Sequence, residues 1–407
     1  MYNSLHGITC SCDMNMQMMD TECDGIVFRK RSKASKLMAL RDTSKTSRVI
    51  LYTQLIIQAS NRNRISPLIT QLSVINLLTP CTSRLSVSDS LLDIINFQHY
   101  RIIESIFVSM CNSKLFNDID VQDENDWIVN HQSDEQTFND WCKSYNVVKS
   151  NKSRICIQPI GDFSGPGQKL LSWLQSYCSA YYFGIKVAIL PPISITKIGC
   201  KCRINSETRR CQLRATDIID HLKLTRKPHA ICTVAVTMLD LYPKESWNFV
   251  FGLASLTYGV GVFSFARYTD TFYRTPPNKD TTDNYTCAEV TAKLLWRACK
   301  VMTHEIGHMF GIKHCVYHNC AMNGSNHLAE SDRRAPSLCP ICLRKLQEAL
   351  KFDLADRYGT LLKFCEGSLT DSQTPLSEFA EYGEWLKKAV SFLESKQYKT
   401  QVGRRPR

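Results

Sequence analysis

Eleven consecutive residues, from His304 to His314, constrain this chain more than any other part of its sequence. They have the pattern H-E-x-x-H-x-x-G-x-x-H. On a helix, His304 and His308 are four residues apart and point the same way, so that both imidazoles can reach one metal ion. Glu305 lies beside them as a carboxylate that can take a proton from a metal-bound water. The pattern therefore predicts a helix that carries a catalytic zinc site.

The end of the same motif predicts a third zinc ligand. Gly311 lies three residues after His308, where a residue without Cβ can adopt a positive φ and end the helix. The turn that follows brings His314 back toward the metal. Three protein ligands leave the fourth position for water, which is typical of a catalytic site rather than a closed structural one. The alternative is an amphipathic core helix whose histidines have ordinary hydrogen-bond partners.

Four cysteines follow the histidine motif with the spacing C-x4-C and then C-x2-C: Cys315, Cys320, Cys339 and Cys342. Four thiolates form a closed tetrahedral shell, so these residues predict a second, structural zinc ion. Because Cys315 is bonded to His314, this second metal would fix the backbone that carries the third imidazole. A redox C-x-x-C pair, or cysteines buried as small apolar side chains, are the alternatives.

A methionine lies between the second and third of these cysteines. Met322 precedes the turn-forming pair Asn323 and Gly324. A methionine on a tight turn shortly after the third histidine matches the Met-turn, which is the apolar floor beneath the metal in metzincins. Taken alone, a methionine near a turn is more often ordinary packing, and the neighbouring motifs favour the Met-turn here.

Together these residues resemble the archaemetzincin (archaelysin) family of zinc metallopeptidases, and most of all its vertebrate-type members. The likeness rests on the histidines, the four cysteines and the stretch from Gly324 to Leu328, and it extends from about residue 154 to about residue 352. It implies a metzincin-like zincin domain with an active-site helix and a four-cysteine zinc subsite. It also implies two zinc ions per chain and peptide-bond hydrolysis by a zinc-bound water that Glu305 activates.

The order of predicted elements indicates the α/β class. We predict strands over residues 154–160, 186–190, 231–239 and 259–268, and helices over residues 168–182, 217–224 and 288–310. Strands that alternate with helices favour a mixed, twisted sheet. By the resemblance, residues 259–268 are also the candidate edge strand to which a substrate chain is added, with an ordinary sheet strand as the alternative.

We divide the chain into four parts. Residues 153–352 form the catalytic domain, and residues 101–152 form a helical preamble that packs on it. Residues 353–407 form a helical C-terminal extension with a basic tail. Residues 1–100 are interpreted as an atypical extension that is disordered in part, with a mis-joined reading frame as the alternative.

The charge and the cysteines bear on partners and compartment. The formal net charge of +12 is concentrated in basic clusters over residues 29–48 and 404–407. No aromatic residues are interleaved there, so solvated tails are favoured over nucleic-acid contacts. The 19 cysteines are odd in number and scattered, which favours a reducing compartment. Because neither a signal peptide nor an apolar run of about 18 residues is evident, we expect a cytoplasmic or nuclear protein without a membrane span.

The leading functional hypothesis is a monomeric zinc endopeptidase or aminopeptidase that acts on peptides or proteins. A catalytically weak, zinc-stabilised scaffold and a nucleic-acid-associated protein are the alternatives. Some metzincins place a tyrosine, two residues after the Met-turn methionine, as a donor to the transition-state oxyanion. That position here is Gly324. Asn326, His327, a backbone N–H or the metal alone therefore remain candidates for this role.

Overall fold

The computed structural model describes residues 103–132, 135–145, 154–269, 272–273, 290–367 and 377–395. All of these residues belong to one compact unit of the chain. The predicted N-terminal extension over residues 1–100 and both basic clusters lie outside the described residues.

A five-stranded mixed sheet with the strand order β2-β1-β5-β8-β7 lies at the centre of this unit. Its parallel strands are β1 (Arg154–Ile160), β2 (Lys186–Ile189), β5 (Ala230–Thr237) and β8 (Val260–Ser264), and β7 (Gly252–Ser255) is antiparallel to β8. Strands β1 and β5 are buried along almost their whole length, as expected for parallel strands that are covered on both faces. The mixed sheet and its helices confirm the predicted α/β class.

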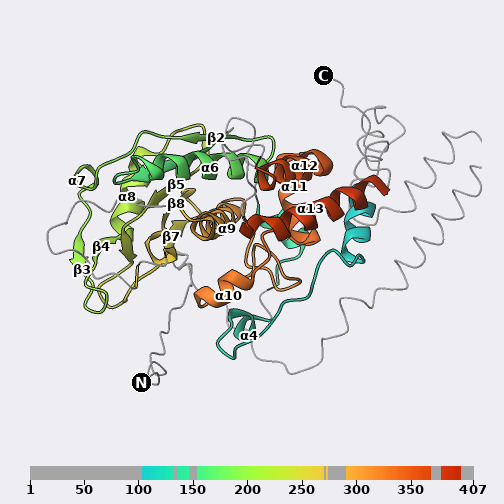
Figure 1. Ribbon diagram of the computed structural model, residues 1–407, viewed down its shortest axis with the longest axis horizontal. Helices are drawn as coiled ribbons and strands as arrows, with labels where there is room; N and C mark the ends of the chain where they lie inside the picture. The colour runs from blue at the N-terminus through green and yellow to red at the C-terminus, as the bar shows by residue number, and fades with distance from the viewer. Residues whose placement is uncertain are drawn as a thin grey trace, which may run out of the picture. The chain divides into compact units, whose positions relative to one another are not determined.

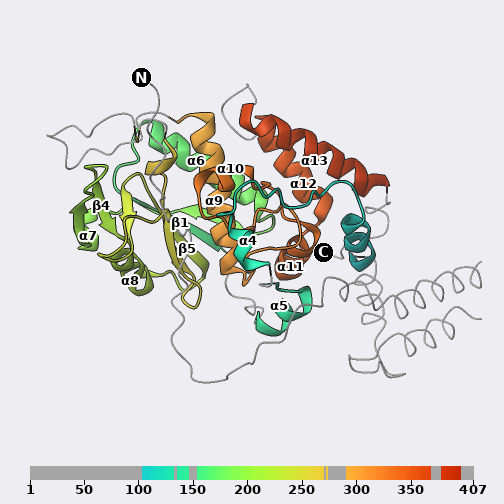
Figure 2. The same cartoon turned by 90° about the horizontal axis from the view of Figure 1, so that it is seen from below.

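Helices cover both faces of this sheet (Figures 1 and 2). The helices α6 (Pro166–Tyr181) and α9 (Ala292–Met309) pack on one face, and α8 (Ala215–Thr225) packs on the other. Successive residues of β5 serve the two layers, because Val234 packs with α6 and α9 whereas Ala235 packs with α8. The zinc-motif helix α9 therefore lies directly against the sheet.

The predicted edge strand is wrong. Strand β8 lies between β5 and β7, so residues 259–268 do not form an edge of the sheet. The strand ends at Ser264, and the next residues form the 3-10 turn η1 (Ala266–Tyr268). On this side of the sheet the edge strand is β7, which was not predicted because it has only four residues and includes a glycine, and β2 is the edge on the other side. Periodicity in the sequence indicates a strand but not its neighbours in the sheet.

A second, three-stranded sheet has the order β3-β4-β6. Its strands are β3 (Cys202–Ile204), β4 (Cys211–Arg214) and β6 (Asp240–Tyr242), and the short helix α7 (Ile195–Ile198) precedes it. A buried ion pair between Asp240 and Arg267, 2.7 Å long, ties this sheet to the turn after β8.

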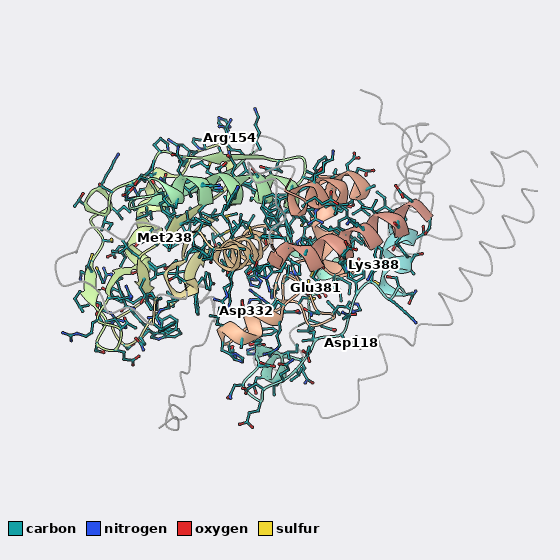
Figure 3. The ribbon with its side chains drawn as sticks, in the orientation of Figure 1. Asp118, Arg154, Met238, Asp332, Glu381 and Lys388 are labelled. Atoms are coloured by element: carbon teal, nitrogen blue, oxygen red, sulfur yellow. The ribbon has the colours of Figure 1, made fainter. Side chains whose placement is uncertain are left out.

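The remaining labelled helices come before β1 and after α9 in the chain. They are α4 (Trp127–His131), α5 (Phe138–Ser144), α10 (Leu328–Arg333), α11 (Pro340–Leu350), α12 (Leu354–Cys365) and α13 (Ser377–Ser395). Asp332, labelled on α10 in Figure 3, pairs with Arg297 of α9 at 2.6 Å. The helices α12 and α13 form the expected helical C-terminal extension, and Phe379 of α13 packs edge-on against Trp296 of α9. Within the described residues, no helix combines the length and the apolar character that crossing a membrane requires.

Candidate metal centre

Helix α9 carries the first two histidines of the motif and the glutamate near its C-terminal end. It begins after Thr291, whose side chain accepts a hydrogen bond from Leu294 N. It ends before Gly311, which has a φ of 73°. Only glycine adopts this left-handed conformation without strain, so the chain can reverse at this point. The reversal places His314 beside His304 and His308, with the candidate ligand atoms of all three residues within 4.8 Å of one another.

The orientation of two imidazoles is set by backbone carbonyls. His304 Nδ1 lies 2.7 Å from Ala321 O, and His308 Nδ1 lies 2.6 Å from Ile312 O. A carbonyl can only accept, so each Nδ1 carries the proton and each Nε2 presents a lone pair. The two Nε2 atoms are 3.1 Å apart. Two lone pairs that face each other so closely fit a shared cation, and a zinc ion with Zn–N distances of about 2.0–2.1 Å fits between them.

Burial keeps these imidazoles neutral. It lowers the pKa of His308 to about 4. Burial, followed by the charge of Arg334, holds the pKa of His304 well below its usual range, and burial does the same for His314. A metal-ligating histidine must be neutral, so all three side chains are in the required form at neutral pH. His304 and His308 are 4% and 7% exposed, whereas His314 is only partly buried and lies on the open side of the cluster.

Glu305 is a buried carboxylate without a partner at one oxygen. The residue is 8% exposed, and its Oε2 has no hydrogen-bond partner among the described residues. Burial raises the pKa of Glu305 to about 8, against the opposing effect of the Arg334 guanidinium. A carboxylate in this environment holds a proton more strongly than one in water, which suits a general base.

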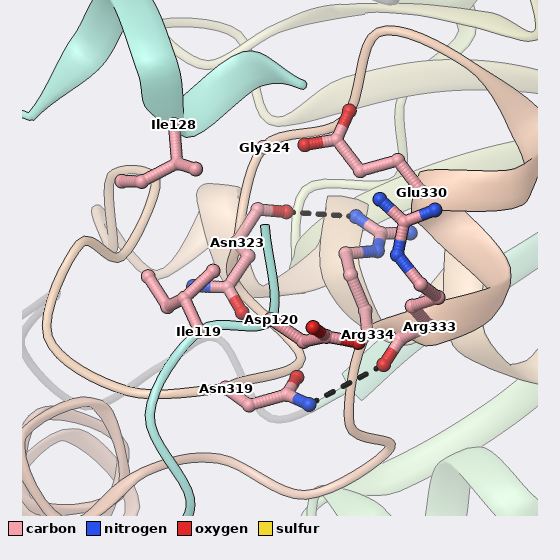
Figure 4. Close-up of a pocket in the computed structure, with 9 residues that line it drawn as sticks. All are labelled: Ile119, Asp120, Ile128, Asn319, Asn323, Gly324, Glu330, Arg333 and Arg334. Carbon is pink, nitrogen blue, oxygen red and sulfur yellow. Dashed lines mark hydrogen bonds between the residues drawn. The ribbon is translucent and has the colours of Figure 1, made fainter. Parts of the chain in front are cut away.

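Arg334 lies beside these groups, and the sequence analysis missed it. Its guanidinium is buried, with Nη1 donating to Asn323 O at 2.9 Å and lying 3.0 Å from His304 Nδ1. Figure 4 shows Arg334 next to Arg333 at a small cavity of about 20 Å³, which is room for about one water molecule. Nothing in the local sequence distinguishes the buried Arg334 from an exposed arginine, because its burial depends on distant segments.

The four cysteines form a second cluster that is buried throughout. Their Sγ atoms lie within 4.8 Å of one another, and the Sγ atoms of Cys315 and Cys339 are 3.6 Å apart. This separation is far longer than a disulfide bond of about 2.05 Å. It is close to the ~3.8 Å between sulfurs that a tetrahedral zinc with Zn–S bonds of about 2.3 Å requires. The donor set therefore fits a structural zinc ion.

Local structure prepares these sulfurs for a cation. Cys339 N donates to Cys320 Sγ at 3.2 Å, and Met322 N lies 3.4 Å from the same sulfur. Hydrogen bonds from the thiols of Cys320, then Cys339 and Cys342, hold the pKa of Cys315 well below its usual range. The neighbouring thiols thus stabilise the thiolate form of Cys315 even without a metal ion.

Met322 packs under the ligand-bearing turn of α9. It is 1% exposed, and a Cβ placed on Gly307 would lie 2.5 Å from its sulfur. Gly307, one of the unspecified positions of the histidine motif, is therefore required by the close approach of this methionine. Cys315 N donates to Met322 O at 2.7 Å, which joins the methionine turn to the cysteine cluster.

Two residues considered as oxyanion donors are hydrogen-bonded to the preamble. Asn326 Nδ2 donates to Asn125 O at 2.9 Å, and His327 Nε2 lies 3.0 Å from Asp126 Oδ1. Both side chains therefore contact the preamble. Trp127, which the sequence analysis did not assign to the site, instead lies against His314, with ring centroids 4.8 Å apart.

Comparison with known proteins identifies the family. Residues 176–348 match the model of Peptidase family M54. Archaemetzincin-2 of Mus musculus is 40% identical over 316 residues, which cover 69% of this chain and 88% of that protein. This chain belongs to the archaemetzincin family. The finding confirms the resemblance that was inferred from the histidines and cysteines.

Two further members of the family show a more distant likeness. Archaemetzincin-1 of Homo sapiens is 31% identical over 278 residues, covering 64% of this chain and 55% of that protein. The crystal structure of an archaemetzincin from Methanopyrus kandleri is 27% identical with a TM-score of 0.36, and the match covers 50% of this chain and 98% of that one.

Proposed function

We propose that this protein is a metzincin-type zinc metallopeptidase that hydrolyses peptide bonds, with Glu305 as the general base. The observation that carries the proposal is the unpartnered Oε2 of the buried Glu305, next to imidazoles whose Nε2 lone pairs converge. Membership of a peptidase family supports it. A scaffold protein would have no need for an unsatisfied buried carboxylate at this place, because such a group destabilises the fold.

His304, His308 and His314 would hold the catalytic zinc ion. When bound, zinc supplies a Lewis acid that polarises the substrate carbonyl and makes a water more acidic. Glu305 performs the proton transfers. Its free Oε2 accepts a proton from the attacking water, holds it in the buried environment and then donates it to the leaving amine. Cys315, Cys320, Cys339 and Cys342 would hold a second zinc ion, whose role is structural because four thiolates leave no open position.

The edge strand β7 is the candidate surface for the substrate. In the sheet it is hydrogen-bonded to β8 on one side, and an extended peptide can add to the free side of an edge strand through main-chain hydrogen bonds. We accordingly propose a peptide or protein as the substrate of a monomeric enzyme. Nucleic acid is not part of this proposal, because the basic clusters lie outside the described residues.

The decisive experiment measures zinc content and cleavage of a broad peptide library together, for the wild-type chain and for Glu305→Gln. We expect two zinc ions per chain in both proteins, with cleavage reduced about 10²–10⁴-fold in Glu305→Gln, the range typical of general-base catalysis. The glutamine preserves the shape of the side chain and cannot accept the proton. Equal cleavage by both proteins would refute the role of Glu305. Absence of cleavage in the fully zinc-loaded wild type would favour a zinc-stabilised scaffold.

A further inference from the structure

The preamble contacts the turn that joins the second and third histidines. Trp141 Nε1 donates to Phe310 O at 2.8 Å. Gln136 Nε2 donates to Gly311 O at 3.0 Å, and Gln136 Oε1 accepts from Lys313 N at 3.1 Å. Three hydrogen bonds from residues about 170 positions earlier in the chain therefore hold three of the four residues before His314.

These bonds satisfy groups that the end of a helix leaves open. The last carbonyls of a helix have no partner within it. In this turn, Gly311 N returns to His308 O at 2.8 Å, and Ile312 O accepts from the His308 imidazole. The carbonyls of Phe310 and Gly311 receive their donors from the preamble instead. Without the preamble, two carbonyls of a largely buried turn would lose their partners.

A second contact reaches the third imidazole directly. Trp127 of α4 is 3% exposed and presents its ring at 74° to His314, with centroids 4.8 Å apart. Trp127 also stacks on His131, with ring centroids 4.3 Å apart. His304 and His308 are oriented by carbonyls, whereas His314 is packed by an aromatic ring from the preamble.

A third contact connects this turn to the cysteine cluster. Lys345 is 1% exposed, and its Nζ donates to Gln136 O at 2.5 Å and to Gln136 Oε1 at 3.0 Å. Lys345 lies on α11, three residues after Cys342. A buried ammonium requires partners of this kind. Gln136 therefore bridges the turn before His314 and helix α11, which carries Cys342 and begins directly after Cys339.

We propose that Gln136 and Trp141 are positioning residues for the zinc site, which hold the turn so that His314 points at the other two imidazoles. The preamble is then part of the metal centre, although it lies outside the segment that matches the family model. The inference rests on the proposed binding of zinc by the three histidines. Loss of groups that orient metal ligands typically weakens metal affinity about 10–100-fold.

The test measures the zinc affinity of the histidine site in the full chain by competition with a chromophoric chelator. Trp141→Phe removes one indole N–H and preserves most of the ring. The matched control is Trp385→Phe, since Trp385 Nε1 donates to Leu115 O at 2.7 Å in the same manner but from α13, away from the turn. The double variant Gln136→Met/Lys345→Met removes the bridge without leaving a buried ammonium unpaired.

We expect zinc affinity at the histidines to fall about 10–100-fold in Trp141→Phe and in the double variant, and to be unchanged in Trp385→Phe. Each tryptophan variant loses one hydrogen bond, so both should lower the melting temperature of the metal-free protein, and the control shows whether lost stability alone weakens zinc binding. At saturating zinc, Trp141→Phe should recover most of its cleavage activity. Wild-type affinity in both test variants, or an equal loss in the control, would overturn the inference. A wild-type protein that binds no zinc at the histidines would instead refute the proposed function.

Discussion

The histidine cluster and the cysteine cluster are joined by one peptide bond, between His314 and Cys315, yet they differ in almost every physical respect. The cysteines are all buried and supply four sulfurs. The histidines supply three nitrogens, and His314 remains partly exposed. Carbonyls accept from the imidazole N–H groups, whereas backbone amides point at the cysteine sulfur. Backbone carbonyls thus stabilise neutral imidazoles in the histidine cluster, which is the open cluster. A backbone amide stabilises a charged thiolate in the cysteine cluster, which is the closed cluster.

The difference indicates that the cysteine cluster contributes to the stability of the fold, whereas the histidine cluster is suited to chemistry. A closed shell of four thiolates leaves a metal no free position, so binding there contributes to folding. The open cluster instead contains unsatisfied groups, including Glu305 Oε2. Such groups are unfavourable in the metal-free fold and are retained at sites that perform chemistry.

The largest effect should come from opening the closed cluster. Cys342→Ser should release the structural zinc and lower the free energy of unfolding by about 5 kcal/mol or more, because metal binding there is coupled to folding. Zinc stoichiometry and thermal unfolding measure the two effects. Cys365→Ser is the matched control, since Cys365 is also buried but lies on α12 outside the cluster. If both variants lose stability equally and retain their zinc, metal binding by the four cysteines does not contribute to folding.

A smaller effect should appear in the pH dependence of the open cluster. Burial raises the pKa of Glu305 from 4.5 to about 8, so the folded state binds a proton that the unfolded state has already released. Stability from this group is complete below pH 4.5 and is lost as the pH rises through 8. With the histidine site emptied by limited chelation, Glu305→Gln should remove this loss, by up to about 5 kcal/mol at high pH. Urea unfolding at about pH 4 and about pH 9, on either side of that window, checks the sign; equal pH dependence in both proteins would contradict it.

The smallest effect should come from the floor of the open cluster. In Gly307→Ala the new Cβ would lie 2.5 Å from Met322 Sδ, and overpacking of this kind costs about 1–3 kcal/mol. The higher helix propensity of alanine offsets up to about 1 kcal/mol of this cost. Gly359→Ala on α12 is the control, because nothing lies within 4 Å of its Cβ. We expect Gly307→Ala to destabilise and Gly359→Ala to stabilise in thermal unfolding, and a further Met322→Val change to rescue Gly307→Ala. A stabilising Gly307→Ala would show that the methionine is not packed tightly against the helix.

Residues close in the sequence were the ones that could be predicted. The spacing of His304, His308 and Gly311 is a property of one helix and its end, and helix geometry is the same in every protein. The four cysteines also share a short segment, so their meeting needed no knowledge of the rest of the fold. Most predicted strands and helices agree with the observed ones within a few residues, because each depends on its own periodicity.

Residues far apart in the sequence were missed. Arg334 contacts His304, and Trp127 contacts His314. Gln136 bonds to the turn before His314. These contacts join distant segments, and the neighbours of the three residues in the sequence do not indicate them. The prediction of β8 rather than β7 as the edge strand was wrong for the same reason, since the order of strands in a sheet depends on how distant parts of the chain pack together. His327 and Asn326 were considered as donors because they follow the Met-turn, but the preamble occupies both side chains.

The sequence by itself determined which side chains are the candidate zinc ligands, because their types and their helical spacing are local properties that no other part of the chain can change. Only the tertiary structure decided which groups surround those ligands: the carbonyls that set the imidazole tautomers, the buried Arg334 beside Glu305 and the preamble around His314. Burial and long-range hydrogen bonds arise when segments far apart in the chain meet, and their energies depend on that meeting rather than on any single segment.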